Sequence, residues 1–150
     1  MIENLPRGVR NHNPGNIRLS KTRWQGQRAM QFDPSFVEFE TPIMGLRALM
    51  KVLITYYTKY GLNCVQSIIN RWAPPHENAT DAYAQHVSRK LNVRRRDALN
   101  VCDPSILIKL AQAITLHENG RPPRSYPFYW YDDAVYTQAC DLALNTQKGE

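Results

Sequence analysis

The segment from Asp103 to Gly120 carries a start signal, an apolar stripe and a stop signal. Asp103 can cap the amino end, Pro104 is tolerated in the first turn, and Gly120 can adopt the backbone conformation that ends a helix. Four apolar residues follow the i, i+3, i+4, i+7 spacing of a buried helical face: Leu107, Leu110, Ala111 and Ile114. The sequence therefore predicts a helix here with one buried apolar face.

Glu118 continues that stripe one turn after Ile114, so its carboxyl group should face the buried side. The negative end of the helix dipole and an apolar neighbourhood both disfavour an ionised carboxylate. We therefore expect Glu118 to hold a proton that it can donate. The alternative is a frayed last turn, with Glu118 in water or paired with an arginine.

Length and composition indicate one globular domain over residues 1–150, with 43% hydrophobic residues. The net charge of +6 favours polyanionic partners: nucleic acid, an anionic cell wall or a membrane surface. Cys64, Cys102 and Cys140 have the spacing of neither a disulfide framework nor a metal site, and we expect no metal or cofactor. No apolar run is long enough to span a bilayer, and residues 1–10 lack the apolar stretch of a signal peptide.

Proline, glycine and apolar periodicity divide the chain into three parts. Residues 1–18 are a turn-rich entry, residues 19–41 a small β-lobe with two or three short strands between Trp24 and Glu40, and residues 42–145 a helical lobe. Besides the segment already described, helices are expected from Thr41-Pro42 to Gly61, from about Asn63 to Trp72, from a cap at Thr80 or Asp81 to Leu91, and from Asp133 through Leu142. The fold class is α+β and mainly helical.

Three stretches resemble one family. The run Asn13-Pro14-Gly15-Asn16-Ile17-Arg18, followed by Trp24-Gln25-Gly26, is similar to the β-lobe of the glucosaminidase branch of lysozyme-like peptidoglycan hydrolases. The run Ala79-Thr80-Asp81-Ala82-Tyr83 resembles the start of that branch's helix whose tyrosine lines the active cleft, although Ala82 replaces the usual proline. The segment Leu110–Gly120 resembles the helix that carries the catalytic glutamate.

The order of these stretches differs from that of the family, in which the glutamate helix comes first. The resemblance therefore implies a circularly permuted lysozyme-like fold, which is plausible because domain termini commonly lie close together. The runs Arg7–Asn16 and Arg71–Asn78 are also similar to phage and prophage proteins that are described as virion structural or lysozyme-like.

The resemblance implies cleavage of peptidoglycan glycan strands by a muramidase, glucosaminidase or lytic transglycosylase, with Glu118 as general acid and Tyr83 lining the cleft. A hydrolase needs a second carboxylate, for which Glu38, Glu40 and Glu77 are candidates, whereas a lytic transglycosylase works with one glutamate. The residues expected to bind substrate are Asn13, Asn16, Arg18, Trp72, Asn78, Asn119 and Tyr126.

Two further hypotheses remain open. The chain could be a non-catalytic virion protein that keeps the lysozyme-like shape, or a basic nucleic-acid-binding domain that uses Arg94-Arg95-Arg96, although such a run is usually a solvated surface. His117 is expected to pack or to cap the helix. We expect a monomer that is made in the host cytoplasm, that acts in the periplasm and cell wall or within the virion, and that contacts other virion proteins there.

Overall fold

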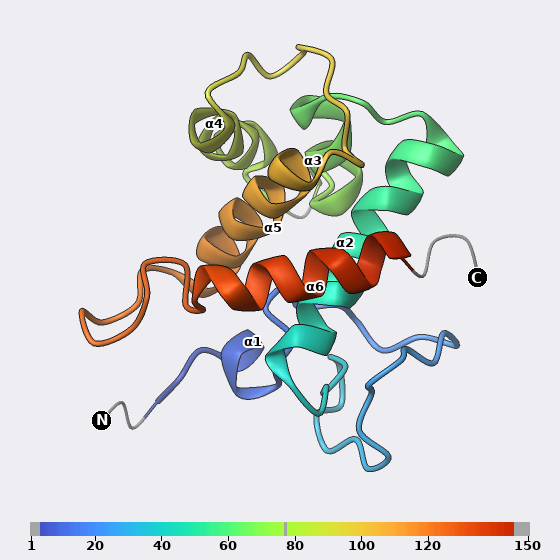
Figure 1. Ribbon diagram of the computed structural model, residues 1–150, viewed down its shortest axis with the longest axis vertical. Helices are drawn as coiled ribbons and strands as arrows, with labels where there is room; N and C mark the ends of the chain where they lie inside the picture. The colour runs from blue at the N-terminus through green and yellow to red at the C-terminus, as the bar shows by residue number, and fades with distance from the viewer. Residues whose placement is uncertain (1–3, 77, 146–150) are drawn as a thin grey trace.

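The computed structural model describes residues 4–76 and 78–145, and within them the chain is mainly helical, as the sequence predicted. The helices are α1 (Arg7–Arg10), α2 (Pro42–Tyr60), α3 (Val65–Trp72), α4 (Thr80–Leu91), α5 (Pro104–Asn119) and α6 (Asp133–Asn145). Helix α6 packs across α2, while α5 contacts α1, α2, α4 and α6 (Figure 1). The helix that ends near Glu118 is therefore central to the molecule.

The two longest helices confirm the predicted start and stop signals. The Thr41 hydroxyl accepts a hydrogen bond from the backbone N–H of Met44, which begins α2, and Gly61 ends it with a φ of 66°. The Asp103 carboxylate accepts from the N–H of Ser105, which begins α5, and Gly120 follows its last residue with a φ of 77°. The stripe of α5 is fully buried at Leu107, Leu110, Ala111 and Ile114.

The predicted cap of α4 is wrong. The N-cap residue is Ala79, whose side chain makes no capping hydrogen bond, and Thr80 is already inside the helix. The Thr80 hydroxyl instead donates to the carbonyl of Ala73 at 2.6 Å, across the loop that joins α3 to α4. This hydroxyl therefore holds the ends of α3 and α4 together, and is not available to cap the helix.

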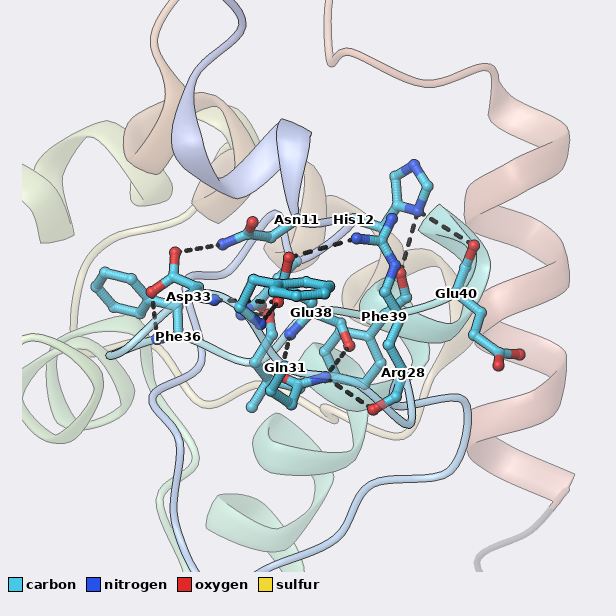
Figure 2. A network of polar contacts seen from close by, with 12 residues as sticks. Asn11, His12, Arg28, Gln31, Asp33, Phe36, Glu38, Phe39 and Glu40 are labelled. Carbon is cyan, nitrogen blue, oxygen red and sulfur yellow. Dashed lines mark hydrogen bonds and ion pairs between the residues drawn. The ribbon is translucent and has the colours of Figure 1, made fainter.

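The segment 19–41 contains far less β-structure than predicted. In the part of the chain that the structure describes, its pairing is limited to two isolated antiparallel bridges, Arg18 with Phe36 and Gln27 with Phe39. Side chains make hydrogen bonds that a neighbouring strand would make in a sheet. The Gln31 amide donates to the carbonyls of Arg28 and Glu38 and accepts from the N–H of Glu38. Figure 2 shows this network, in which backbone groups that a strand partner would satisfy bond to side chains.

A small second core attaches this segment to α2. Val37, Phe39 and Ala48 are buried together, and Met44 packs against them. The first turn of α2 also lies directly on the N-terminal turn: a β-carbon added at Gly45 would stand only 1.8 Å from the carbonyl oxygen of His12. The turn that follows α1 is thus pressed between α2 and the end of α5.

Candidate functional site

Glu118 lies in the last turn of α5, partly buried, and both of its carboxyl oxygens accept hydrogen bonds. The Tyr83 hydroxyl of α4 donates to Oε2 at 2.9 Å, and the Asn16 amide donates to Oε1 at 3.1 Å. Both donors precede α5 in the sequence, and they lie 35 and 102 residues before Glu118. These two contacts define the direction of the carboxyl group.

Tyr83 is itself held by three neighbours. Its side chain is almost fully buried, its hydroxyl accepts from the indole N–H of Trp72 at 3.2 Å, and its ring stacks on His117 with ring centroids 3.6 Å apart. Burial, and then the negative charge of Glu118, raise the pKa of Tyr83 well above its usual value. The phenol therefore keeps its proton and remains a donor to Glu118.

His117 packs, as the sequence indicated, and it packs against Tyr83. Its Nδ1 lies 3.3 Å from Nδ1 of His86 on α4. Burial, followed by the charge of His86, lowers the pKa of His117 below its usual value. The neutral ring is therefore the form that stacks on Tyr83 at neutral pH.

The turn that carries Asn16 is closed by Asn13. The buried Asn13 amide donates to the carbonyls of Ile17 and Val37, and its oxygen accepts from the N–H of Ile17. Asn16 has a left-handed backbone with a φ of 51°, a conformation that asparagine tolerates well. The Asn119 amide donates to the carbonyl of Pro14 at 2.8 Å, which ties this turn to the end of α5.

A cleft of about 540 Å³ opens beside Glu118. Its lining includes three aromatic side chains from three separate parts of the chain: Phe36, Tyr56 and Trp72. The polar and charged lining residues are Asn16, Arg18, Asn78 and Glu118. Aromatic faces with a few converging polar groups are suited to a sugar ring, which has both apolar C–H faces and hydroxyl edges.

The structure brings six of the predicted residues together: Glu118, Tyr83, Asn16, Arg18, Trp72 and Asn78. Asn13 and Asn119 lie next to them and hold the turn in place. Tyr126 is not among the lining residues; it makes an edge contact with Trp130, 5.4 Å between centroids, in the segment after α5. Glu77 lies outside the described residues.

Glu38, predicted as a second carboxylate, lies outside the cleft lining and holds the loop of segment 19–41 instead. Its Oε2 accepts from the backbone N–H groups of Phe32 and Asp33, and its Oε1 accepts from the Arg28 guanidinium at 3.4 Å (Figure 2). Both oxygens are therefore occupied within their own loop. Glu40, the other candidate there, is exposed and also does not line the cleft.

The sequence reasoning missed Tyr56 and the place of Phe36. Tyr56 of α2 lines the cleft, although nothing in the sequence singled it out. Phe36 lines the cleft as well, and its ring lies under two arginine side chains. The available signal was an aromatic residue at the border of an apolar stripe, where one edge of the ring is buried and the other faces a groove.

Among the described residues, no group of three or more His, Cys, Asp or Glu side chains is arranged to hold a metal ion. None of the helices in the described part of the chain has the length and apolar character needed to cross a bilayer. Two of the residues in the basic run Arg94-Arg95-Arg96 face nearby carboxylates: Arg94 lies 3.8 Å from Asp97, and Arg95 lies 3.7 Å from Asp81.

These observations define a class of protein: mainly helical, with a carboxyl group in a cleft that aromatic side chains line. No model of a known protein family matches the chain. The chain belongs to the same family as Protein P5 of Pseudoalteromonas phage PM2. The two are 39% identical over 128 residues, which cover 83% of this chain and 78% of the phage protein. The relative thus links the family to a phage, and its name describes no chemistry.

Proposed function

We propose that this protein cleaves the glycan strands of peptidoglycan, with Glu118 as the general acid. The observation that carries the proposal is the position of Glu118, whose carboxyl group borders a cleft lined by aromatic side chains and is oriented by Tyr83 and Asn16. A glycosidic bond breaks when a carboxyl group protonates the leaving oxygen while the sugar develops positive charge. A partly buried carboxyl group that two hydrogen bonds orient is suited to that step.

The lining of the cleft favours chemistry with a single carboxyl group. Among the described residues, Glu118 is the one carboxylate in that lining. In such a site Glu118 gives its proton to the glycosidic oxygen as the C1–O bond breaks. A hydroxyl of the same sugar then attacks C1, and its proton returns to Glu118. We therefore favour the lytic transglycosylase route, in which no water is consumed, over hydrolysis.

A circularly permuted lysozyme-like fold is part of this proposal. The supporting observation is the arrangement of the three motif stretches, which lie far apart in sequence and meet around Glu118 through Asn16, Tyr83 and Asn119. Segment 19–41, with its two isolated bridges, takes the place of the small β-lobe. We further propose that the protein is a monomer made in the host cytoplasm, that it acts on the cell wall or from the virion, and that it contacts other virion proteins.

A second candidate is a non-catalytic virion protein of the same shape. The observation in its favour is that both carboxyl oxygens of Glu118 are engaged, so Glu118 also joins the N-terminal turn to α4 and α5. A carboxylate in that position stabilises the fold whether or not a substrate ever enters the cleft. The phage origin of Protein P5 suits both candidates equally.

Glu118→Gln separates the two candidates. The wild type is incubated with purified sacculi, and the released fragments are analysed by mass spectrometry, in which an anhydro sugar end identifies the transglycosylase product. We expect Glu118→Gln to release at least about a thousandfold less material. The matched control is Glu40→Gln, an exposed glutamate outside the cleft, which should stay at the wild-type rate.

The same variant tests the structural alternative through its stability. If Glu118 mainly joins segments, Glu118→Gln should lower the free energy of unfolding by about 1–3 kcal/mol, because one donor would then face the new amide NH₂. A folded wild type that releases nothing from several types of sacculus would overturn the enzyme proposal in favour of the virion protein.

A further inference from the structure

Two arginine side chains lie over the ring of Phe36, and they differ in their partners. The Arg7 guanidinium is 4.6 Å from the ring centroid and forms two hydrogen bonds with the Asp33 carboxylate, each of 2.6 Å. The Arg18 guanidinium is 5.3 Å from the centroid. In the described part of the chain, no carboxylate lies within ion-pair distance of Arg18. Of the two cations, Arg18 is the one whose charge is uncompensated.

The backbone places Arg18 firmly at the edge of the cleft. Arg18 pairs with Phe36 in an antiparallel bridge, and the N–H of the next residue, Leu19, donates to the Ser35 carbonyl at 2.9 Å. Both Arg18 and Phe36 line the cleft, and Arg18 is exposed there. The ring supports the guanidinium from one side by a cation–π contact, which leaves its N–H edge free for a ligand.

The charges of the cleft determine what kind of ligand it can accept. Among the described lining residues, the charged side chains are Arg18 and Glu118. Arg18 is the cation of that lining, and its charge attracts an anionic glycan whether or not Glu118 holds its proton. Arg18 stands two residues after Asn16, whose amide bonds to Glu118, so its positive charge enters the same cleft. The pair therefore suits a substrate that presents an anion close to the bond to be cleaved.

We propose that Arg18 binds a carboxylate of the substrate and makes the cleft selective for an acidic glycan over a neutral one. That the ligand is a glycan rests on the proposed function; that it is anionic rests on Arg18. A planar guanidinium can hold a carboxylate with two parallel N–H···O bonds. Peptidoglycan offers two sources: the lactyl ether of every second sugar, where no peptide is attached, and the stem peptide where one is.

Binding is measured in the Glu118→Gln background, so that the result does not depend on turnover. Three probes of equal glycan length are compared by calorimetry: peptide-free strands with free lactyl carboxylates, peptide-bearing strands, and a neutral chitin oligomer. We expect Arg18→Gln to weaken binding of the acidic probes by about tenfold or more and to leave the chitin oligomer unchanged. Arg23→Gln is the matched control, an exposed arginine of the same segment outside the cleft.

The pattern of losses identifies the source of the carboxylate. A loss confined to peptide-free strands assigns it to the lactyl group, and a loss confined to peptide-bearing strands assigns it to the stem peptide. Arg18→Lys should restore only part of the affinity, because a lysine cannot form the paired contact.

Equal weakening of acidic and neutral probes by Arg18→Gln, no weakening of either, or no binding of any probe would overturn the inference. Acidic selectivity that depends on Arg18 in a protein that cleaves nothing would leave the inference standing and refute the proposed function. If Glu118→Gln abolishes cleavage but Arg18→Gln leaves the selectivity for acidic probes unchanged, the proposed function stands and the inference about Arg18 is refuted.

Discussion

At the scale of single residues, Tyr83 controls the geometry around Glu118. Its hydroxyl group uses one proton to donate to Glu118 and one lone pair to accept from Trp72, while its ring stacks on His117. Since burial raises the pKa of Tyr83 well above its usual value, the hydroxyl keeps its proton at neutral pH and remains the donor to Glu118. A single hydroxyl group therefore connects α3, α4 and α5 at the cleft.

Tyr83→Phe removes this hydroxyl while it keeps the stacked ring. We expect the rate of strand cleavage to fall by about ten- to a hundredfold, because a hydrogen bond to a charged group contributes about 1.5–3 kcal/mol. The free energy of unfolding should fall by only about 1–2 kcal/mol, since the Trp72 N–H loses its acceptor. Steady-state rates and denaturant unfolding measure the two effects, and an unchanged rate would deny Tyr83 any part in positioning Glu118.

The carboxylate of Asp33 makes the stability of the protein depend on pH. Its carboxylate accepts from Arg7, Asn11 and the N–H groups of Ser35 and Phe36, and these hydrogen bonds, led by that of Arg7, hold the pKa of Asp33 well below its usual value. The native state then binds fewer protons than the unfolded state. This stabilisation is present above about pH 4 and is lost as the pH falls toward the native pKa.

Thermal unfolding between pH 6 and pH 2 tests this linkage. Asp33→Asn should be less stable than the wild type at pH 6, and the gap between the two melting temperatures should shrink toward pH 2. A gap that stays constant over this range would show that the charge of Asp33 contributes nothing. The low exposure of the Asp33 side chain, 9%, favours a measurable effect, although Arg7 is 43% exposed and solvent weakens the pair.

At the scale of elements, the close approach of α2 to the N-terminal turn positions Asn16. Gly45 lies in the first turns of α2 with no room for a β-carbon beside the His12 carbonyl, and Gly15 lies against Leu49 and Trp72. These two contacts bring the turn down onto the helices. Only then can Asn16 reach Glu118 and Asn119 reach the backbone of Pro14.

Gly45→Ala tests this packing. In an exposed helix the change would stabilise the protein by about 1 kcal/mol, because alanine has the higher helix propensity. Here the new methyl group meets a backbone carbonyl, so we expect a loss of at least about 2 kcal/mol in the free energy of unfolding. Thr55→Ala on the exposed face of the same helix should change stability by less than about 0.5 kcal/mol. A stabilised Gly45→Ala would refute the close approach.

At the scale of the whole molecule, the cleft exists only when the N-terminal turn meets the end of α5. Asn16 and Glu118 are 102 residues apart, and Pro14 and Asn119 are 105 residues apart. The small core of segment 19–41 includes Ala48, which belongs to α2. Because the segment and the helical part share this core, we expect them to unfold as one cooperative unit and not as two separable lobes.

Unfolding in guanidinium chloride tests this cooperativity. Trp24 lies against the small core, Trp72 borders the cleft, and Trp130 anchors the segment after α5. Tryptophan fluorescence and far-UV circular dichroism should therefore give the same midpoint and the same slope. A fluorescence midpoint clearly below that of circular dichroism would mean that segment 19–41 unfolds on its own.

Much of the helical fold could be predicted because its signals are local. Thr41, Gly61, Asp103 and Gly120 act on backbone groups within a few residues, so they mark the ends of α2 and α5 without knowledge of the rest. Thr80 shows the limit of this reasoning. It has the residue type of a cap, but its hydroxyl donates to Ala73, seven residues away across a loop.

Segment 19–41 has isolated bridges in place of the predicted strands, and Glu38 lies outside the cleft lining, for one shared reason. Gln31 and Glu38 look like ordinary polar residues of a surface strand, but their side chains bond the backbone of segment 19–41 in place of a neighbouring strand. A side chain that serves as a partner for backbone groups leaves no periodic trace in the sequence. The sequence therefore offers Glu38 as a free carboxylate, whereas in the structure both of its oxygens accept hydrogen bonds within segment 19–41.

The sequence by itself determined the helices, the buried stripe of α5 and the place of Glu118 at the end of that stripe, because caps and apolar periodicity depend on neighbouring residues. Only the tertiary structure decided what surrounds this carboxyl group: the donors Tyr83 and Asn16, the aromatic lining with Tyr56, and the positive charge of Arg18. These partners come from segments far apart in the chain. Their meeting depends on the packing of α2, α4 and α5 against the N-terminal turn, which no local pattern encodes.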